Sequence, residues 1–322
     1  MSSSDQLKAL LRAHIEGDED RFSAVAMQLA AHEARIGHGK LALELRDMID
    51  KAKARETNRP VPLIQPRGEL ADLLQASYPK VRLADMVLDD AIKNRLDRLI
   101  REQRQVEKLR AHGLAPRKKL LLIGPPGTGK TLTASVLAGE LSLPLFVVRL
   151  DSLMTKFMGE TAAKLRLIFD AIRRTRAVYL FDEFDSIGGQ RSLGNDVGEI
   201  RRVLNSFLQL IEQDVSDSLL IAATNHPDLL DHALFRRFDD VIRYAVPDEA
   251  LIAQTLKAKL AGFKTRRLQW ASLARAAAGL SHGDISRACE DAIKDAILHD
   301  RPALETADVR ATLEERGAIH GK

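Results

Sequence analysis

A glycine-rich stretch at residues 124–131, GPPGTGKT, directly follows the apolar run KKLLLI. It fits the pattern G-x-x-x-x-G-K-[ST], with Gly124, Gly129, Lys130 and Thr131 at the defining positions. The glycines allow successive backbone N–H groups to turn toward phosphates, and a helix that begins near Thr131 adds the positive end of its dipole. Lys130 would meet the β- and γ-phosphates, and the Thr131 hydroxyl would bind Mg²⁺. In its strand–loop–helix context the pattern predicts a site for a nucleoside triphosphate.

An acidic pair, Asp182 and Glu183, ends a later apolar run, AVYLFDEFD. A parallel strand beside the phosphate-loop strand would bring both carboxylates to the metal and the γ-phosphate. Asp182 would hold Mg²⁺, directly or through water, and Glu183 would orient and polarise the attacking water. The pair could instead cap the next helix, but capping does not explain its arrival beside a phosphate loop.

A third apolar run, SLLIAATN, ends at Asn225, whose amide can bind both the γ-phosphate and the water. Beyond it, LDHALFRRFDD carries Arg236 and Arg237. Two arginines far from the chain's own phosphate loop suggest fingers supplied to a neighbouring subunit. The alternative is a solvated pair or a salt bridge to Asp239 or Asp240, and the spacing from Asn225 weighs against it.

The stretch TKFMGET, residues 155–161, places Phe157 and Met158 between a strand-like and a helix-like segment. Residue type alone favours inward packing, because large apolar residues beside helix starts mostly join the core. An exposed apolar pair would need a function.

The elements that must position these residues alternate along the chain from about residue 80. Short apolar runs typical of buried strands are separated by helical patterns, which predicts a parallel sheet sandwiched by helices. The candidate strands are KKLLLIG, LPLFVVRL, AVYLFDE, SLLIAATN and DVIRYAV. After about residue 247 only helical patterns remain.

We therefore expect four parts: a helical bundle at 1–55, a linker at 56–80, an α/β nucleotide-binding domain at 81–247 and a helical lid at 248–322. The bundle is small, so partner or substrate docking and a solubilising extension both remain open. Prolines in ETNRPVPLIQPRGE favour an extended linker.

Composition restricts the partners. The net charge is only +4, from 49 basic and 45 acidic interspersed residues, and aromatics make up 4%, so nucleic acid is an improbable ligand. We find no membrane-length apolar run and no secretory signal, and the single cysteine, Cys289, suits a buried helix position. A cytoplasmic location is the expectation.

From about residue 80 to 320 the chain resembles AAA+ ATPases of the AAA family, with GPPGTGKT, LFDEFD and AATNHPDLLDHALFRRFDD in order. The resemblance implies ATP and Mg²⁺ as cofactors, a hexamer with ATP at its subunit interfaces, and Arg236 and Arg237 acting in trans. The residues that it implies for nucleotide binding in the phosphate loop are Pro126, Gly127, Thr128, Gly129, Lys130, Thr131 and Leu132.

Two further segments extend the resemblance. LADMVLDDAIKNRL is similar to the segment that folds over adenine, which implies Asp85, Met86 and Val87 near the base. GLSHGDISRACEDA resembles the sensor-2 helix, but His282 and Gly283 replace the usual Gly-Ala, so His282 is expected near adenine or ribose. No arginine occupies the customary sensor-2 place.

The resemblance also reverses the interpretation of TKFMGET. In the family, an aromatic–hydrophobic pair followed by Gly-Glu lines the central pore of the hexamer, which implies that Lys156, Phe157 and Met158 contact a polypeptide substrate. GGQRSLGNDVGEIRR corresponds to the second pore loop, with Arg191 as a contact. FLQLIEQDVSD lacks the Asp-Gly-Phe motif that many relatives use for intersubunit signalling, and the compact LFRRFDD, without a Pro-Gly insert, is closer to the katanin and spastin group.

The N-terminal region resembles a bacterial subgroup encoded beside a subtilisin-like serine protease in plasmid-incompatibility, toxin–antitoxin or phage-defence pairs. The leading hypothesis is a hexameric Mg²⁺-dependent ATPase that threads or remodels a protein and regulates or feeds that protease. The alternatives are an ATP-gated switch that holds a partner enzyme in check and a nucleic-acid helper ATPase.

Overall fold

The computed structural model describes residues 25–27, 29, 30, 32, 38, 65–153, 160–184, 197–229 and 235–319. The chain divides into two compact units, Met1–Ile64 and Gln65–Lys322. In the first unit the described residues between 25 and 32 are helical. The rest of the predicted bundle at 1–55 lies outside the described residues, so its organisation stays a prediction.

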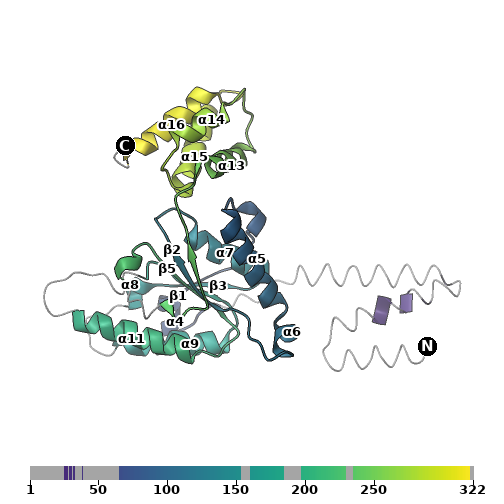
Figure 1. The fold of residues 1–322 in the computed structure, drawn as a ribbon, viewed down its shortest axis with the longest axis vertical. Coiled ribbons are helices and arrows are strands. Elements are labelled where there is room, and N and C mark those ends of the chain that lie inside the picture. The colour runs from purple at the N-terminus through teal and green to yellow at the C-terminus, as the bar shows by residue number, and fades with distance from the viewer. Residues whose placement is uncertain are drawn as a thin grey trace. The chain divides into compact units, whose positions relative to one another are not determined.

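A six-stranded sheet forms the centre of the second unit, with strand order β1-β3-β4-β5-β2-β6 (Figure 1). The neighbours among β3, β4, β5, β2 and β6 pair in parallel, and β1 pairs with β3 in the antiparallel direction. All five predicted strands are confirmed. The strands are β1 Leu74–Ser77, β2 Lys119–Ile123, β3 Leu145–Val148, β4 Val178–Phe181, β5 Leu219–Thr224 and β6 Asp240–Arg243.

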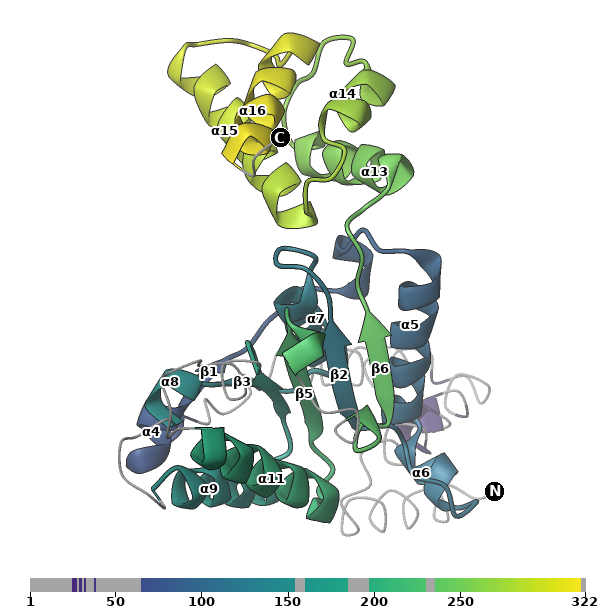
Figure 2. The ribbon, with the colours of Figure 1, turned by 60° about the vertical axis from the view of Figure 1, so that its left-hand side comes forward.

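Helices cover both faces of this sheet (Figure 2). The α-helices of this part are α4 Glu69–Leu73, α5 Asp90–Arg104, α6 Val106–Arg110, α7 Lys130–Leu141, α8 Leu150–Leu153, α9 Glu160–Arg174 and α11 Val197–Gln213. Two short 3₁₀ turns add η1 Leu83–Asp85 and η2 Pro227–Leu229.

Alternation along each strand divides the core between the two faces. In β2, Leu120 and Leu122 pack with the buried side chains of α5 and α7, whereas Leu121 and Ile123 pack with those of α9 and α11. Because the four inner strands β3, β4, β5 and β2 are apolar on both sides, only a sheet covered on both faces removes these side chains from water.

The predicted linker at 56–80 ends earlier than expected. Residues 69–77 form α4 and β1 instead, and Leu74 of β1 lies opposite Val148 of β3. The short segment joins the sheet through backbone pairing and the burial of Leu73 and Leu74, which the proline-rich composition around it conceals. Residues 56–64 lie outside the described part of the chain.

Four helices make the lid, as predicted: α13 Glu249–Leu260, α14 Trp270–Ala276, α15 His282–Leu298 and α16 Thr306–Ile319. They enclose a core of their own, which includes Cys289 at no measurable exposure. Burial raises the pKa of the Cys289 thiol to about 12, so this cysteine is an inert packing residue.

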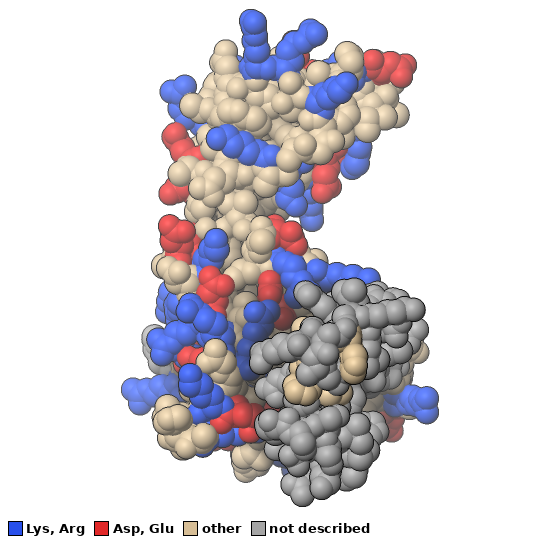
Figure 3. Space-filling view, turned by 90° about the vertical axis from the view of Figure 1, so that its right-hand side faces the viewer, with Lys and Arg blue, Asp and Glu red and all other residues tan. Residues whose placement is uncertain are grey.

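Charge is interspersed on the described part of one face of the protein. On the described part of the face in Figure 3, acidic and basic side chains both occur along its length. In the parts of the chain that the structure describes, no helix is long and apolar enough to cross a membrane.

Candidate active site

The phosphate loop connects β2 to α7 and takes a conformation that requires glycine. Gly127 and Gly129 have φ of 73° and 102°, in the left-handed region that other residues rarely adopt. A side chain at Gly127 would also collide with Ser281 Oγ of the lid. The loop is therefore shaped both for a turn and for close contact with the lid.

Lys130 begins α7 and is almost completely buried, with 6% of its surface exposed. Its Nζ donates to the carbonyl oxygens of Gly124 and Pro125 at 2.7 and 2.8 Å. Thr128 Oγ1 also donates to Pro125 O, at 2.8 Å. The Lys130 ammonium group is thus held by carbonyl oxygens of its own loop.

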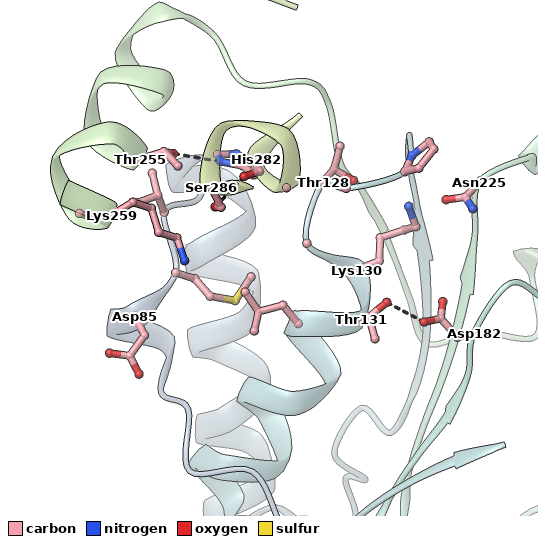
Figure 4. Close-up of a pocket in the computed structure, with 18 of the residues that line it drawn as sticks. Asp85, Thr128, Lys130, Thr131, Asp182, Asn225, Thr255, Lys259, His282 and Ser286 are labelled. Atoms are coloured by element: carbon pink, nitrogen blue, oxygen red, sulfur yellow. Dashed lines mark hydrogen bonds between the residues drawn. The ribbon is translucent and has the colours of Figure 1, made fainter. Parts of the chain in front are cut away.

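Thr131 and Asp182 meet beside this loop. Thr131 Oγ1 donates to Asp182 Oδ2 at 2.6 Å, so a hydroxyl and a carboxylate oxygen lie side by side (Figure 4). Hydroxyl and carboxylate oxygens are ligands that suit Mg²⁺. Glu183 follows with φ of 50°, exposed, while its backbone N–H donates to Asp182 Oδ1 at 3.0 Å.

The sheet order explains this convergence. β4 and β2 both pair in parallel with β5, so the three carboxyl ends lie on the same edge of the sheet. Asp182 and Glu183 follow β4, Asn225 follows β5, and the phosphate loop follows β2. The three motifs are thereby brought together although they are far apart in the chain.

The opposite end of the site is formed by the segment around η1. Arg82 Nη1 donates to Gly139 O at 2.7 Å, and Leu83 N donates to Glu140 Oε1 at 3.0 Å, which anchors the segment to the end of α7. The Asp85 carboxylate accepts from the Arg82 backbone N–H at 2.8 Å. The carboxylate of Asp85 is thus used to hold the turn.

The lid closes the site from the third side. Gly283 N donates to Gly127 O at 2.9 Å, a direct backbone bond between lid and phosphate loop. Sequence reasoning missed four lining residues of the lid: Thr255, Ala258, Lys259 and Ser286. The first three are spaced i, i+3 and i+4 on α13, the spacing of one helix face, which was the available signal.

These elements enclose a pocket of about 380 Å³ (Figure 4). Every residue that the sequence predicted for nucleotide or metal binding lines it, and so do Glu183 and Asn225. Among the described residues, no arginine lines the pocket. The full lining is Asp85, Met86, Val87, Pro126, Gly127, Thr128, Gly129, Lys130, Thr131, Leu132, Asp182, Glu183, Asn225, Thr255, Ala258, Lys259, His282, Gly283 and Ser286.

Comparison with known proteins agrees with this geometry. Residues 120–246 match the family "ATPase family associated with various cellular activities (AAA)". The "Uncharacterized AAA family ATPase y4kL" of Sinorhizobium fredii (strain NGR234) is 36% identical over 320 residues, which cover 98% of this chain and 96% of that protein. The chain belongs to the AAA family of ATPases. ATP hydrolysis is the activity of its α/β domain.

Other relatives of this AAA ATPase are longer. "ATP-dependent zinc metalloprotease FtsH 4" of Sphaerobacter thermophilus is 32% identical over 255 residues, 76% of this chain but 38% of that protein. The FtsH of Rickettsia felis is 34% identical over 230 residues, 69% of this chain and 36% of that protein. The chain thus spans about two fifths of the length of these metalloproteases.

The remaining predicted site residues of the AAA ATPase are not among the described residues that line the pocket. Lys156, Phe157, Met158 and Arg191 fall outside the described residues. Arg236 and Arg237 are exposed, and neither lines the pocket.

The alternative salt bridges of the arginines are not the ones we observe. Arg237 pairs with Glu212, near the end of α11. Asp239 instead accepts from the backbone N–H groups of Lys118 and Lys119, at 2.8 and 2.9 Å. Asp240 pairs with Arg95 and Arg117.

Proposed function

We propose that this AAA ATPase hydrolyses Mg²⁺-ATP at the subunit interfaces of a homo-hexamer and uses the energy to thread or remodel a polypeptide through a central pore. The observation that carries the proposal is the composition of the pocket. The pocket contains a lysine, a hydroxyl, two carboxylates and an amide for phosphoryl chemistry, and no described arginine lines it. Phosphoryl transfer in such sites depends strongly on an arginine, so a second subunit is the natural donor.

Within one subunit, Lys130 leaves the carbonyl oxygens of Gly124 and Pro125 and binds the β- and γ-phosphate oxygens instead. Thr131 and Asp182 are the residues that would hold Mg²⁺. Bound there, Mg²⁺ would neutralise negative charge on the transferring phosphoryl group. The backbone N–H groups at the start of α7 add further positive potential.

Glu183 orients and polarises the attacking water, and Asn225 bonds both that water and the γ-phosphate. Glu183 is exposed to the pocket, and its left-handed backbone conformation directs the residue out of the strand line of β4. Strained positions of this kind cluster at functional sites. The base end of the nucleotide lies against Met86 and Val87, with His282 and Gly283 facing it from the lid.

Arg236 and Arg237 act on the nucleotide of a neighbouring subunit. Their exposure and their absence from the lining of the chain's own pocket support this role. The test is a mixture of two inactive proteins: the double variant Arg236→Ala/Arg237→Ala, and Glu183→Gln. If the arginines act in trans, co-assembled rings contain interfaces with an intact Glu183 and intact arginines, and they recover ATPase activity that neither variant has alone. Co-assembly without recovery would contradict the proposal.

A polypeptide substrate is supported by the relatives. Two of them are ATP-dependent proteases, and their similarity to this chain extends over 69–76% of it. Lys156, Phe157, Met158 and Arg191 would line the pore. Six stacked Phe157 rings could intercalate between the side chains of an extended chain without demanding a sequence.

Residues 1–55 dock the partner, which we propose to be a subtilisin-like serine protease in a plasmid-maintenance or defence system, served by a motor of the katanin and spastin type. The similarity to y4kL includes this region, since it covers 98% of the chain. Deletion of residues 1–55 should abolish co-purification with the protease while basal ATPase activity persists. Retained co-purification would contradict the docking role.

A further inference from the structure

Two lid residues in the pocket, Thr255 of α13 and His282 of α15, are joined by a hydrogen bond (Figure 4). Thr255 Oγ1 lies 3.0 Å from His282 Nδ1, and Thr255 is 3% exposed. The same hydroxyl donates to Leu251 O, one turn back on α13, at 2.8 Å. A hydroxyl has one hydrogen and two lone pairs, so a threonine that donates to Leu251 O must accept from His282.

This arrangement determines the tautomer of His282. Nδ1 carries the hydrogen that Thr255 accepts, and burial lowers the pKa of the ring, which keeps it neutral. Lys259 of α13, a cation that disfavours a charged ring, lines the same pocket, and the carboxylate of Asp284 on α15 accepts a hydrogen bond from Ser281 Oγ. Nε2 therefore has a free lone pair and no hydrogen, and it is the ring nitrogen left for a ligand in the pocket.

We propose that His282 Nε2 accepts a hydrogen bond from a donor on the bound nucleoside, and that Thr255 positions His282 for this by holding the Nδ1–H tautomer. The inference rests on the proposed nucleotide site and adds a determinant of its selectivity. Two groups of an adenine nucleotide offer such a donor, the 6-amino group of the base and the 2′-hydroxyl of the ribose. Both share the chemistry of a neutral donor, and the experiment below separates them.

An acceptor of this kind disfavours nucleosides that lack the matching hydrogen-bond donor. Inosine carries a 6-oxo group, an acceptor that Nε2 would repel, and a 2′-deoxyribose leaves Nε2 without a partner. Loss of one neutral hydrogen bond corresponds to a change in affinity of about three- to tenfold. In this proposal the lid selects the nucleoside, and the phosphate loop binds the phosphates.

The test compares the affinities of ADP, 2′-deoxy-ADP and IDP for the full-length protein, because the diphosphates avoid hydrolysis during titration. His282→Ala should weaken the binding of ADP about three- to tenfold and should not weaken the binding of one of the two analogues. If IDP is the ligand that is not weakened, the donor is the 6-amino group; if it is 2′-deoxy-ADP, the donor is the 2′-hydroxyl.

The role of Thr255 has its own variants. Thr255→Val keeps the shape of the side chain but removes the acceptor of the Nδ1 hydrogen. Like His282→Ala, it should lower the ratio of the affinity for ADP to the affinity for the analogue that lacks the donor. Thr255→Ser should preserve the ratio. Thr312→Val is the matched control, because Thr312 Oγ1 donates to a backbone carbonyl of α16 outside the pocket.

Three outcomes would overturn the inference: His282→Ala weakens all three ligands equally, it weakens none, or Thr255→Val leaves the ratio as in the wild type. Circular dichroism and thermal melting show whether each variant is folded, and a misfolded His282→Ala is replaced by His282→Phe, which keeps an aromatic ring. Failure of the proposed function gives a different result, since the wild-type protein would then bind no ADP at all.

Discussion

The hydroxyl of Thr131 donates to Asp182 Oδ2 across 2.6 Å and so joins the first turn of α7 to the end of β4, 51 residues further along the chain. Both oxygens are ligands that suit Mg²⁺, and in this structure they are hydrogen-bonded directly to each other. The neighbouring Lys130 is likewise bonded to its own loop. Nucleotide binding must therefore exchange bonds within the site for bonds to phosphate and metal.

Thr131→Val removes the hydroxyl and keeps the shape of the side chain. We expect the Mg²⁺ concentration needed for half-maximal ATPase activity to rise by about tenfold or more, because one oxygen ligand is lost. Thr131→Ser retains the hydroxyl and should behave like the wild type. A Mg²⁺ titration of the ATPase rate measures both, and an unchanged titration for Thr131→Val would remove the metal role.

Glu183→Gln should separate binding from hydrolysis. The amide cannot polarise the attacking water, so the ATPase rate should fall about 10²- to 10⁴-fold, the contribution typical of a positioned base. Affinity for ATP should remain, because Lys130 and the loop N–H groups are intact, and the oligomer should accumulate in its ATP-bound form. Single-turnover hydrolysis and nucleotide binding check the two parts, and normal turnover would exclude Glu183 as the water-orienting residue.

Much of the fold follows from local patterns. The five short apolar runs and the four C-terminal helical segments became strands and helices, since the signal for each lies within its own segment. β1 was not predicted, because the alternation of apolar and polar residues in Leu74–Ser77 covers only four residues beside a proline-containing stretch, and the strand is held at the sheet edge by pairing with β3. Pairing between strands that are distant in the chain cannot be predicted from the sequence of either strand alone.

The candidate site divides in the same way. The phosphate loop, Asp182 and Glu183 were predictable because their spacing is dictated by the chemistry of phosphate and metal. Thr255 and Lys259 were missed, because their spacing shows only that they share one face of α13, and the packing of α13 against α15 decides that this face lines the pocket. The pairing of Arg237 with Glu212 was missed for a similar reason: any carboxylate brought near by the fold could have been its partner.

Phe157→Ala tests the pore. Basal ATPase activity should be largely retained, since Phe157 is not one of the residues predicted to bind nucleotide or Mg²⁺, whereas stimulation by a reduced and alkylated, permanently unfolded polypeptide should be lost. Phe157→Tyr keeps an aromatic ring and should retain stimulation. ATPase rates with and without the unfolded polypeptide provide the measurement; full stimulation of Phe157→Ala would disprove the grip.

His282 should make the stability of the lid depend on pH. Burial lowers its pKa in the folded state, so the unfolded state binds more protons as the pH falls through the unfolded value of about 6.5. Its contribution to stability is complete above that value, decreases below it and levels off beneath the folded pKa. Denaturant unfolding at pH 8 and pH 5 should thus show a smaller loss on acidification for His282→Gln than for the wild type. Equal losses would show that His282 does not titrate differently in the folded state.

Gly139, near the end of α7, lies against the segment that leads to the base end of the pocket. A methyl group there would collide with Val81 O and lie close to Pro79 O, both backbone atoms that cannot rotate away. Gly139→Ala should therefore destabilise the protein by about 1–3 kcal/mol in spite of the better helix propensity of alanine. Gly317, in α16, is the matched control, because a methyl group there meets no atom within 4 Å.

Gly317→Ala should be neutral or stabilising by up to about 1 kcal/mol. The two substitutions should also differ in ligand binding. Displacement of the segment at Val81 would move Met86 and Val87, so Gly139→Ala should weaken ADP binding while Gly317→Ala leaves it unchanged. Thermal melting and ADP titration of both variants measure the two effects. Equal melting temperatures for the two variants would contradict this prediction. They would mean that the segment at Val81 moves to accommodate the methyl group at little cost in stability.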